Sequence, residues 1–117
     1  MKARTILFAL FTLALFAATA FAQLKPGDSE NGKRLFMRNG CYQCHGTAGQ
    51  GGSGGARLAQ FKLPLNGFIA FVRNPPSSNM PPYRAKVMTD QELADVYAHI
   101  KTFPEPVPSK NIPLLNE

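Results

Sequence analysis

Cysteine, runs of basic residues and alternating patterns are all scarce in this sequence. The 117 residues include two cysteines, which form at most one disulfide, so a disulfide-held scaffold is excluded. Thirteen basic residues outnumber seven acidic ones, but no basic block and no aromatic–basic interleaving occurs. A nucleic-acid-binding protein is therefore not expected. No long stretch alternates polar and apolar residues, so a β-sheet is not expected either.

Glycine and proline are absent from residues 1–22, which read as a leader. Lys2 and Arg4 precede an apolar run over residues 6–16, and Ala20-Phe21-Ala22 matches the small-x-small pattern of a signal peptidase site. We predict a cleaved secretory signal peptide over residues 1–22 and a periplasmic protein, free in solution or loosely attached to the membrane. The alternative is an uncleaved anchor, although this segment is at the short limit for spanning a bilayer.

The remaining 95 residues hold all ten glycines and all ten prolines and are poor in apolar residues. Cleavage leaves 11 basic and seven acidic residues, a net charge of +4 that could favour an acidic protein partner. This length predicts one domain, over residues 23–103, followed by a Pro-rich extended tail over residues 104–117. So small and polar a chain usually needs a metal or a cofactor to complete its core.

Helical periodicity predicts an all-α fold. One helix is expected over residues 29–39, capped by Asp28 or Ser29 and ended by Gly40. Its face carries Gly32, Leu35, Phe36 and Asn39.

Two further helices follow in the second half of the chain. The stronger pattern predicts a helix over residues 90–102, where Thr89 and Glu92 form a capping box and Pro104 prevents continuation. A shorter helix is expected over residues 67–73, with Asn66 as its cap. Gly-rich and Pro-rich loops separate the helices.

The string Cys41-Tyr42-Gln43-Cys44-His45 carries the chemistry. C-x-x-C-H is the attachment signature of c-type haem. One helical turn places both cysteines on the same side, where their thiols can form thioethers with the two vinyl groups of one porphyrin. His45 then lies beside the anchored ring and can bind the iron as the proximal axial ligand.

Two other uses of this motif remain open at this point. A C-x-x-C pair also serves thiol–disulfide exchange, but that chemistry usually occurs in a βαβ setting, which is absent here. A structural zinc site needs four ligands, and Cys41, Cys44, His45 and His99 are just enough in number.

From residue 27 to about residue 103 the sequence resembles a class I c-type cytochrome of the small bacterial monohaem kind. Gly32 and Phe36 resemble the residue pair of the family's first helix, and Leu93 and Tyr97 resemble positions of its last helix. The resemblance implies three to four short helices packed around one covalently bound haem c, with long Gly/Pro-rich loops and with the first and last helices crossing.

The resemblance also implies a methionine as the second axial ligand. Met80 is the candidate, because it lies in a loop 35 residues after His45 and is followed by two prolines. Met37 is expected to pack or lie on the surface, and Met88 to pack against the last helix. His99 is the competing ligand, and we expect it at the surface.

One further role is implied by the family. Many relatives have Gly-Pro-x-Leu where this chain has Gly55-Ala56-Arg57-Leu58. The backbone carbonyl at the proline position accepts a hydrogen bond from the proximal histidine, a contact that Ala56 can still provide. Apart from the resemblance, Arg57, Arg73 and Arg84 are candidates to neutralise a haem propionate, although a surface position is the commoner explanation for each.

The function expected from these features is electron transfer, without enzymatic activity. The partners would be redox proteins: a dehydrogenase as donor, and an oxidase or another cytochrome as acceptor. Alternatives are a cytochrome subunit of a periplasmic dehydrogenase, a haem enzyme or sensor with an open iron position, and a zinc-binding module. No transmembrane helix is expected after signal cleavage.

Overall fold

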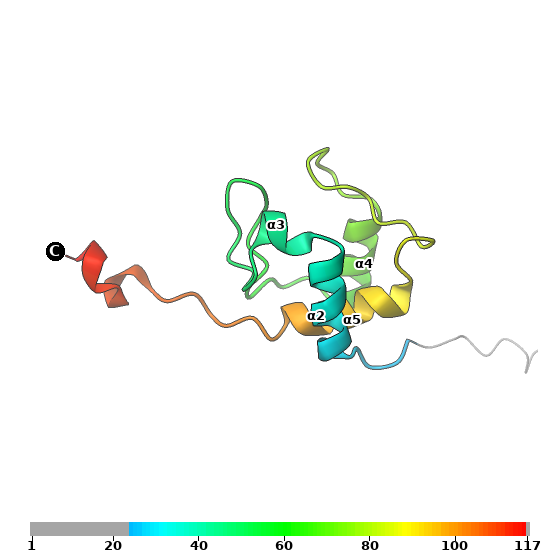
Figure 1. Cartoon of the computed structure of the whole chain (residues 1–117), viewed down its shortest axis with the longest axis horizontal. Helices are drawn as coiled ribbons and strands as arrows, with labels where there is room; N and C mark the ends of the chain where they lie inside the picture. Colours follow the sequence, from blue (N-terminus) through cyan, green and yellow to red (C-terminus); the bar gives the residue numbers. More distant parts are fainter. Residues whose placement is uncertain (1–23, 117) are drawn as a thin grey trace, which may run out of the picture.

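The computed structural model describes residues 24–116, and over this range it contains helices and no strand (Figure 1). The four α-helices are α2 (Ser29–Arg38), α3 (Cys41–His45), α4 (Leu65–Arg73) and α5 (Asp90–Ile100), followed by the 3₁₀ helices η1 (Ser109–Asn111) and η2 (Pro113–Leu115). The all-α prediction is confirmed. The predicted signal peptide, residues 1–22, lies outside the described residues. None of the helices described over residues 24–116 is long and apolar enough to cross a membrane.

The predicted caps fix the start of α2 and of α5. The Asp28 carboxylate accepts hydrogen bonds from the amides of Glu30 and Asn31, at 2.9 and 3.1 Å. At α5 the capping box is complete, because the Thr89 hydroxyl accepts from the Glu92 amide and the Glu92 carboxylate accepts from the Thr89 amide. Both helices end slightly before the predicted residue, as Gly40 turns left-handed with φ 74° and Pro104 follows α5.

Helix α4 corrects one prediction. It begins at Leu65 instead of Gly67. Pro64 is its N-cap residue and has the extended backbone that proline readily adopts. The Pro64 carbonyl accepts the first helical hydrogen bond, from the Phe68 amide at 2.9 Å. Asn66, the expected cap, lies within the helix, where its side chain accepts only from the adjacent Gly67 amide.

Helices α2 and α5 cross in close contact, and their side chains form the hydrophobic core together with Phe68 and Val72 of α4 and residues of the loops. Phe36 and Leu93 are 0% and 1% exposed. The two backbones are so close that a Cβ on Gly32 would overlap the backbone carbonyl of Asp95. Only glycine therefore lets the two backbones approach this closely.

A buried carboxylate joins the two helices beside this crossing. Asp95 of α5 accepts hydrogen bonds from the Asp28 amide at 2.9 Å, the Asn31 side chain at 2.8 Å and the Gln91 side chain at 3.2 Å. Burial by itself raises the pKa of Asp95, but these three hydrogen bonds outweigh it and lower the pKa below its usual value.

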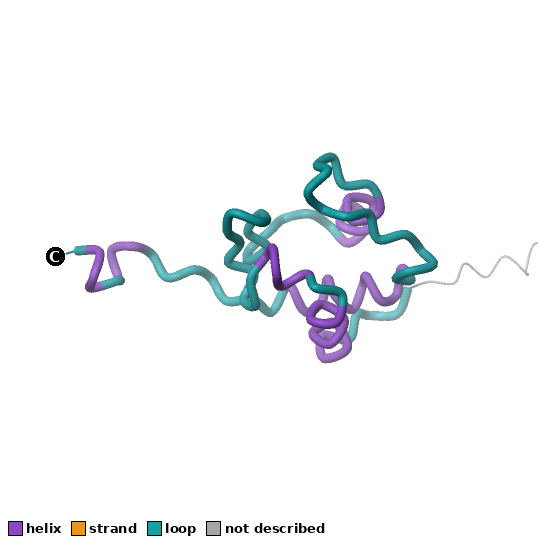
Figure 2. The backbone as a smooth tube through the Cα atoms, turned by 45° about the horizontal axis from the view of Figure 1, so that its top comes forward, coloured by secondary structure: helices purple, strands orange, loops and turns teal. Residues whose placement is uncertain are grey.

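Beyond α5 the chain leaves the helices. Residues 104–116 run outward and end in η1 and η2 (Figure 1 and Figure 2). Leu114 and Leu115 are 81% and 66% exposed there. The helices and loops of residues 24–103 therefore carry the core and the site described below.

Replacement of Gly32 by alanine should lower the free energy of unfolding by about 1–3 kcal/mol, because the added methyl group pushes α2 away from α5. Urea unfolding of the haem-loaded protein measures the loss. Gly52→Ala is the matched control, since nothing lies within 4 Å of a Cβ at that position. Equal effects of the two substitutions would contradict the close crossing.

Asp95→Asn should lower the free energy of unfolding by about 1–3 kcal/mol near neutral pH, because the amide cannot accept all three hydrogen bonds. The lowered pKa means that the unfolded chain takes up a proton on Asp95 more readily than the folded protein. The carboxylate therefore stabilises the fold above the unfolded pKa of about 3.9, and this stabilisation is lost as the pH falls through the lower folded pKa.

Urea unfolding at a series of pH values checks this dependence. The difference between the wild-type protein and Asp95→Asn should be constant near neutral pH and should shrink below about pH 4. Glu105→Gln, which alters an exposed carboxyl in the tail, is the control. A difference that persists unchanged in acid would show that the charge of Asp95 is not what stabilises the fold.

Candidate haem site

The C-x-x-C-H motif forms its own short helix. Gly40 turns the chain at the end of α2, and α3 (Cys41–His45) begins directly after this turn. Both cysteines are free thiols, one helical turn apart, with Cys41 half-buried and Cys44 exposed. Burial raises the pKa of the Cys41 thiol. Both cysteines line one cleft beside α3.

The imidazole of His45 is oriented by a backbone carbonyl. Its Nδ1 lies 2.7 Å from the carbonyl oxygen of Ala56, which can only accept, so Nδ1 carries the proton and Nε2 keeps its lone pair. The loop reaches His45 because Gly55 packs against Cys44 so closely that a Cβ would lie 2.9 Å from the Cys44 carbonyl oxygen. The contact predicted between His45 and Ala56 is thus present in the structure.

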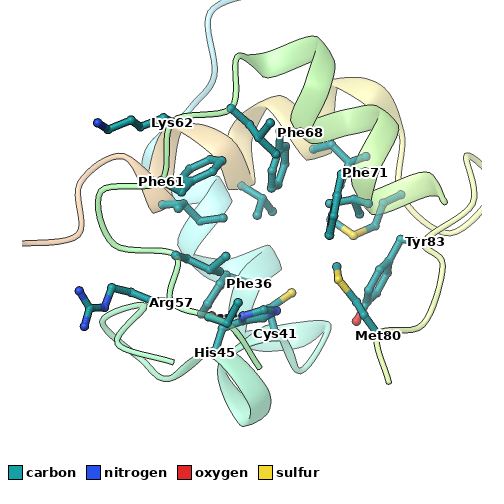
Figure 3. A pocket seen from close by; sticks show the side chains of 18 residues that line it. Phe36, Cys41, His45, Arg57, Phe61, Lys62, Phe68, Phe71, Met80 and Tyr83 are labelled. Atoms are coloured by element: carbon teal, nitrogen blue, oxygen red, sulfur yellow. Dashed lines mark hydrogen bonds between the residues drawn. The ribbon is translucent and has the colours of Figure 1, made fainter. Parts of the chain in front are cut away.

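An apolar cavity lies next to α3. It has a volume of about 230 Å³ and is lined by aromatic and aliphatic side chains of α2, α4 and α5 and of the loops between them (Figure 3). Phe36, Phe61 and Phe68 are among these side chains, and Arg57 and Lys62 lie at its edge. So large an apolar space within a small domain fits a flat, mostly apolar ligand rather than water.

Met80 reaches this cavity from the long loop between α4 and α5. Its side chain points into the cavity, which Cys41 and His45 also line (Figure 3). An adjoining cleft is lined by Cys41, Cys44, His45 and Met80 together. The structure therefore brings together the four side chains predicted for the site, although they come from separate segments.

The competing ligands are placed differently. Met37 is 42% exposed and is not among the residues that line the cavity. Met88 does line it, but it is 2% exposed and packs in the hydrophobic core. His99, expected at the surface, is half-buried and packs edge-on against the rings of Phe36 and Phe103, at centroid distances of 5.5 and 4.9 Å. Burial, followed by the nearby charge of Lys33, lowers its pKa.

The zinc hypothesis loses its fourth ligand in this arrangement. His99 packs against phenylalanine rings, away from the cysteines. Within residues 24–116 no three or more histidine, cysteine, aspartate or glutamate side chains gather in a way that could hold a metal ion.

One wall of the cavity was not predicted from the sequence. Residues 58–64 have no periodic pattern, yet this segment contributes Phe61, Lys62 and Leu63 to the lining. It is held against α5 by hydrogen bonds from Tyr97 to the Leu63 carbonyl (3.0 Å) and from Lys101 to the Phe61 carbonyl (2.9 Å). The only signal in the sequence was Tyr97 on the apolar stripe of α5, which did not identify its partner.

Comparison with known proteins agrees with this geometry. Residues 27–100 match the family model described as cytochrome c oxidase, cbb3-type, subunit III. A curated relative, cytochrome c-555 of Methylococcus capsulatus (strain Bath), is 28% identical over 100 residues, which cover 84% of this chain and 80% of the relative. No solved structure matches the chain significantly.

The match covers more than half of the chain, so the chain belongs to this family of c-type cytochrome domains. It is an electron-transfer protein with covalently bound haem c. The residues present fit this group: Cys41 and His45 line the apolar cavity, and Cys44 lines the cleft that adjoins it. The predicted fold and cofactor are confirmed.

Replacement of Cys44 by serine should leave the haem joined through one thioether, so one vinyl group stays conjugated to the ring. The alkaline pyridine spectrum of the reduced, denatured protein should then shift to longer wavelength. Replacement of both Cys41 and Cys44 should make the haem extractable into acidic organic solvent. Gln43→Ala, at an exposed position between them, should leave the spectrum unchanged. An unshifted spectrum for Cys44→Ser would contradict the assignment.

Proposed function

We propose that this protein carries single electrons on one haem that is attached to Cys41 and Cys44 and ligated by His45 and Met80. The observation that carries the proposal is that these four side chains line one cleft beside an apolar cavity. When bound, the haem iron supplies the change between the ferrous and ferric states.

The protein residues would hold that iron in one environment. The Ala56 carbonyl orients the His45 ring and increases the basicity of its Nε2. Met80 offers a thioether, a ligand that raises the reduction potential. The apolar walls exclude water and would disfavour the extra positive charge of the ferric haem relative to the ferrous haem, which also raises the potential. With both axial positions filled by side chains, no position is left for a substrate, so we expect a carrier and not an enzyme.

The predicted signal peptide supports export and a periplasmic location. Donor and acceptor would be redox proteins that dock transiently near the cavity mouth. A second candidate is a cytochrome subunit held permanently in a larger oxidoreductase, in line with the description of the matching family as an oxidase subunit. Co-purification from the native membrane and soluble fractions distinguishes a free carrier from a subunit.

Met80→Ala should abolish the weak charge-transfer band of ferric sulfur-to-iron ligation and lower the reduction potential. Spectroscopy and redox titration measure both properties on protein produced in cells with cytochrome c maturation machinery. Met37→Ala is the control, because Met37 is exposed and does not line the cavity. Retention of the band in Met80→Ala would refute the axial assignment. Loss of the band in Met88→Ala instead would transfer the role to Met88.

A further inference from the structure

The loop that carries Met80 has little internal support. Residues 75–82 form no helix, and the hydrogen bond found within them is the one from the Asn79 amide to the Ser77 hydroxyl, at 3.2 Å. Four of these eight residues are prolines, which restrict the backbone but donate no hydrogen bonds. The position of Met80 therefore depends on how the two ends of the loop are held.

The C-terminal end of the loop is held at Tyr83. Its amide donates to the Val72 carbonyl of α4 at 3.1 Å, and its hydroxyl donates to the Asn39 carbonyl at 2.9 Å. Asn39 is two residues before Cys41, so Tyr83 connects α4 to the segment that leads into the cysteine motif. In Figure 3 Tyr83 lies beside Met80 at the same wall of the cavity.

Arg73, the last residue of α4, completes this attachment. Its Nη1 donates to the Tyr83 carbonyl and its Nη2 pairs with the carboxylate of Asp90, the first residue of α5. The Arg73 side chain is 15% exposed, so its contact with the Tyr83 carbonyl is partly shielded from water, whereas the Asp90 carboxylate is 57% exposed. A guanidinium holds two acceptors in a fixed geometry, which a lysine ammonium cannot do.

We propose that Arg73 is a positioning residue that keeps Met80 in the cavity by tying the Tyr83 carbonyl to Asp90. The inference rests on the proposed function, in which Met80 ligates the iron. Pro81 and Pro82 lie between Met80 and Tyr83, and their fixed φ angles make this link stiff. A displacement of Tyr83 is therefore passed on to the thioether. Arg73 is committed to this attachment, so it is not the arginine available for a haem propionate.

The test is displacement of Met80 by imidazole in the ferric, haem-loaded protein. Imidazole binds only when the loop has moved away, so its apparent affinity is proportional to the open fraction of the loop. Arg73→Gln should bind imidazole at least about tenfold more tightly than the wild-type protein. Arg73→Lys, which keeps the charge but not the fork, should rescue only part of the difference.

Two further variants make the result specific. Asp90→Asn removes the carboxylate anchor while leaving the Tyr83 contact, and it should increase imidazole affinity by less than Arg73→Gln does. Lys86→Gln removes the same charge from an exposed position near Tyr83 and should bind imidazole as the wild type does. Hydrogen exchange at the Tyr83 amide should be faster in Arg73→Gln and unchanged in Lys86→Gln.

The outcomes separate the two proposals. If the wild-type protein lacks the sulfur charge-transfer band, Met80 ligation itself is wrong. If the band is present but imidazole affinity and Tyr83 exchange are the same in Arg73→Gln and the wild type, the positioning role is refuted. If Arg73→Gln does not fold, the Asp90→Asn variant decides, because the Asp90 side chain is 57% exposed and its replacement should be tolerated. An imidazole affinity of Asp90→Asn equal to that of the wild type would then overturn the proposal.

Discussion

The close crossing of α2 and α5 is the constraint on which the rest of the structure depends. Gly32 allows the two backbones to meet, and Asp95 joins them by accepting hydrogen bonds from the first turn of α2. Both helices also continue into the site. α2 leads through Gly40 into α3, and α5 begins after the long segment between α4 and α5 that carries Met80. The packing of these two helices thus contributes to the placement of the segments that carry the cysteines and Met80.

Much of this arrangement could be predicted from local patterns. The capping box of Thr89 and Glu92 and the cap at Asp28 involve residues close in sequence, so their hydrogen bonds follow from spacing alone. The C-x-x-C-H string likewise spans about one helical turn, so the relative placement of its two cysteines also follows from their spacing. The start of α4 was misplaced because Asn66 is a good cap residue by type, whereas the preceding Pro64 already had the backbone that starts a helix.

Contacts between distant segments could not be predicted in this way. The attachment of Arg73 to Tyr83 and Asp90, and of Lys101 to the loop before α4, joins positions with no shared periodicity. His99 was expected at the surface because it lies beside the apolar stripe of α5, but the crossing angle brings it against two phenylalanine rings. Such contacts depend on the tertiary arrangement, which a single sequence pattern does not contain.

The different surroundings of the two cysteines bear on the order in which the protein is assembled. Thioether formation requires access to each sulfur, and Cys44 remains exposed in the fold whereas Cys41 is half-buried and resists ionisation. The glycine-rich loop also packs directly on Cys44, which narrows the approach to α3. In the folded chain Cys44 is therefore the more accessible of the two sulfur atoms for thioether formation.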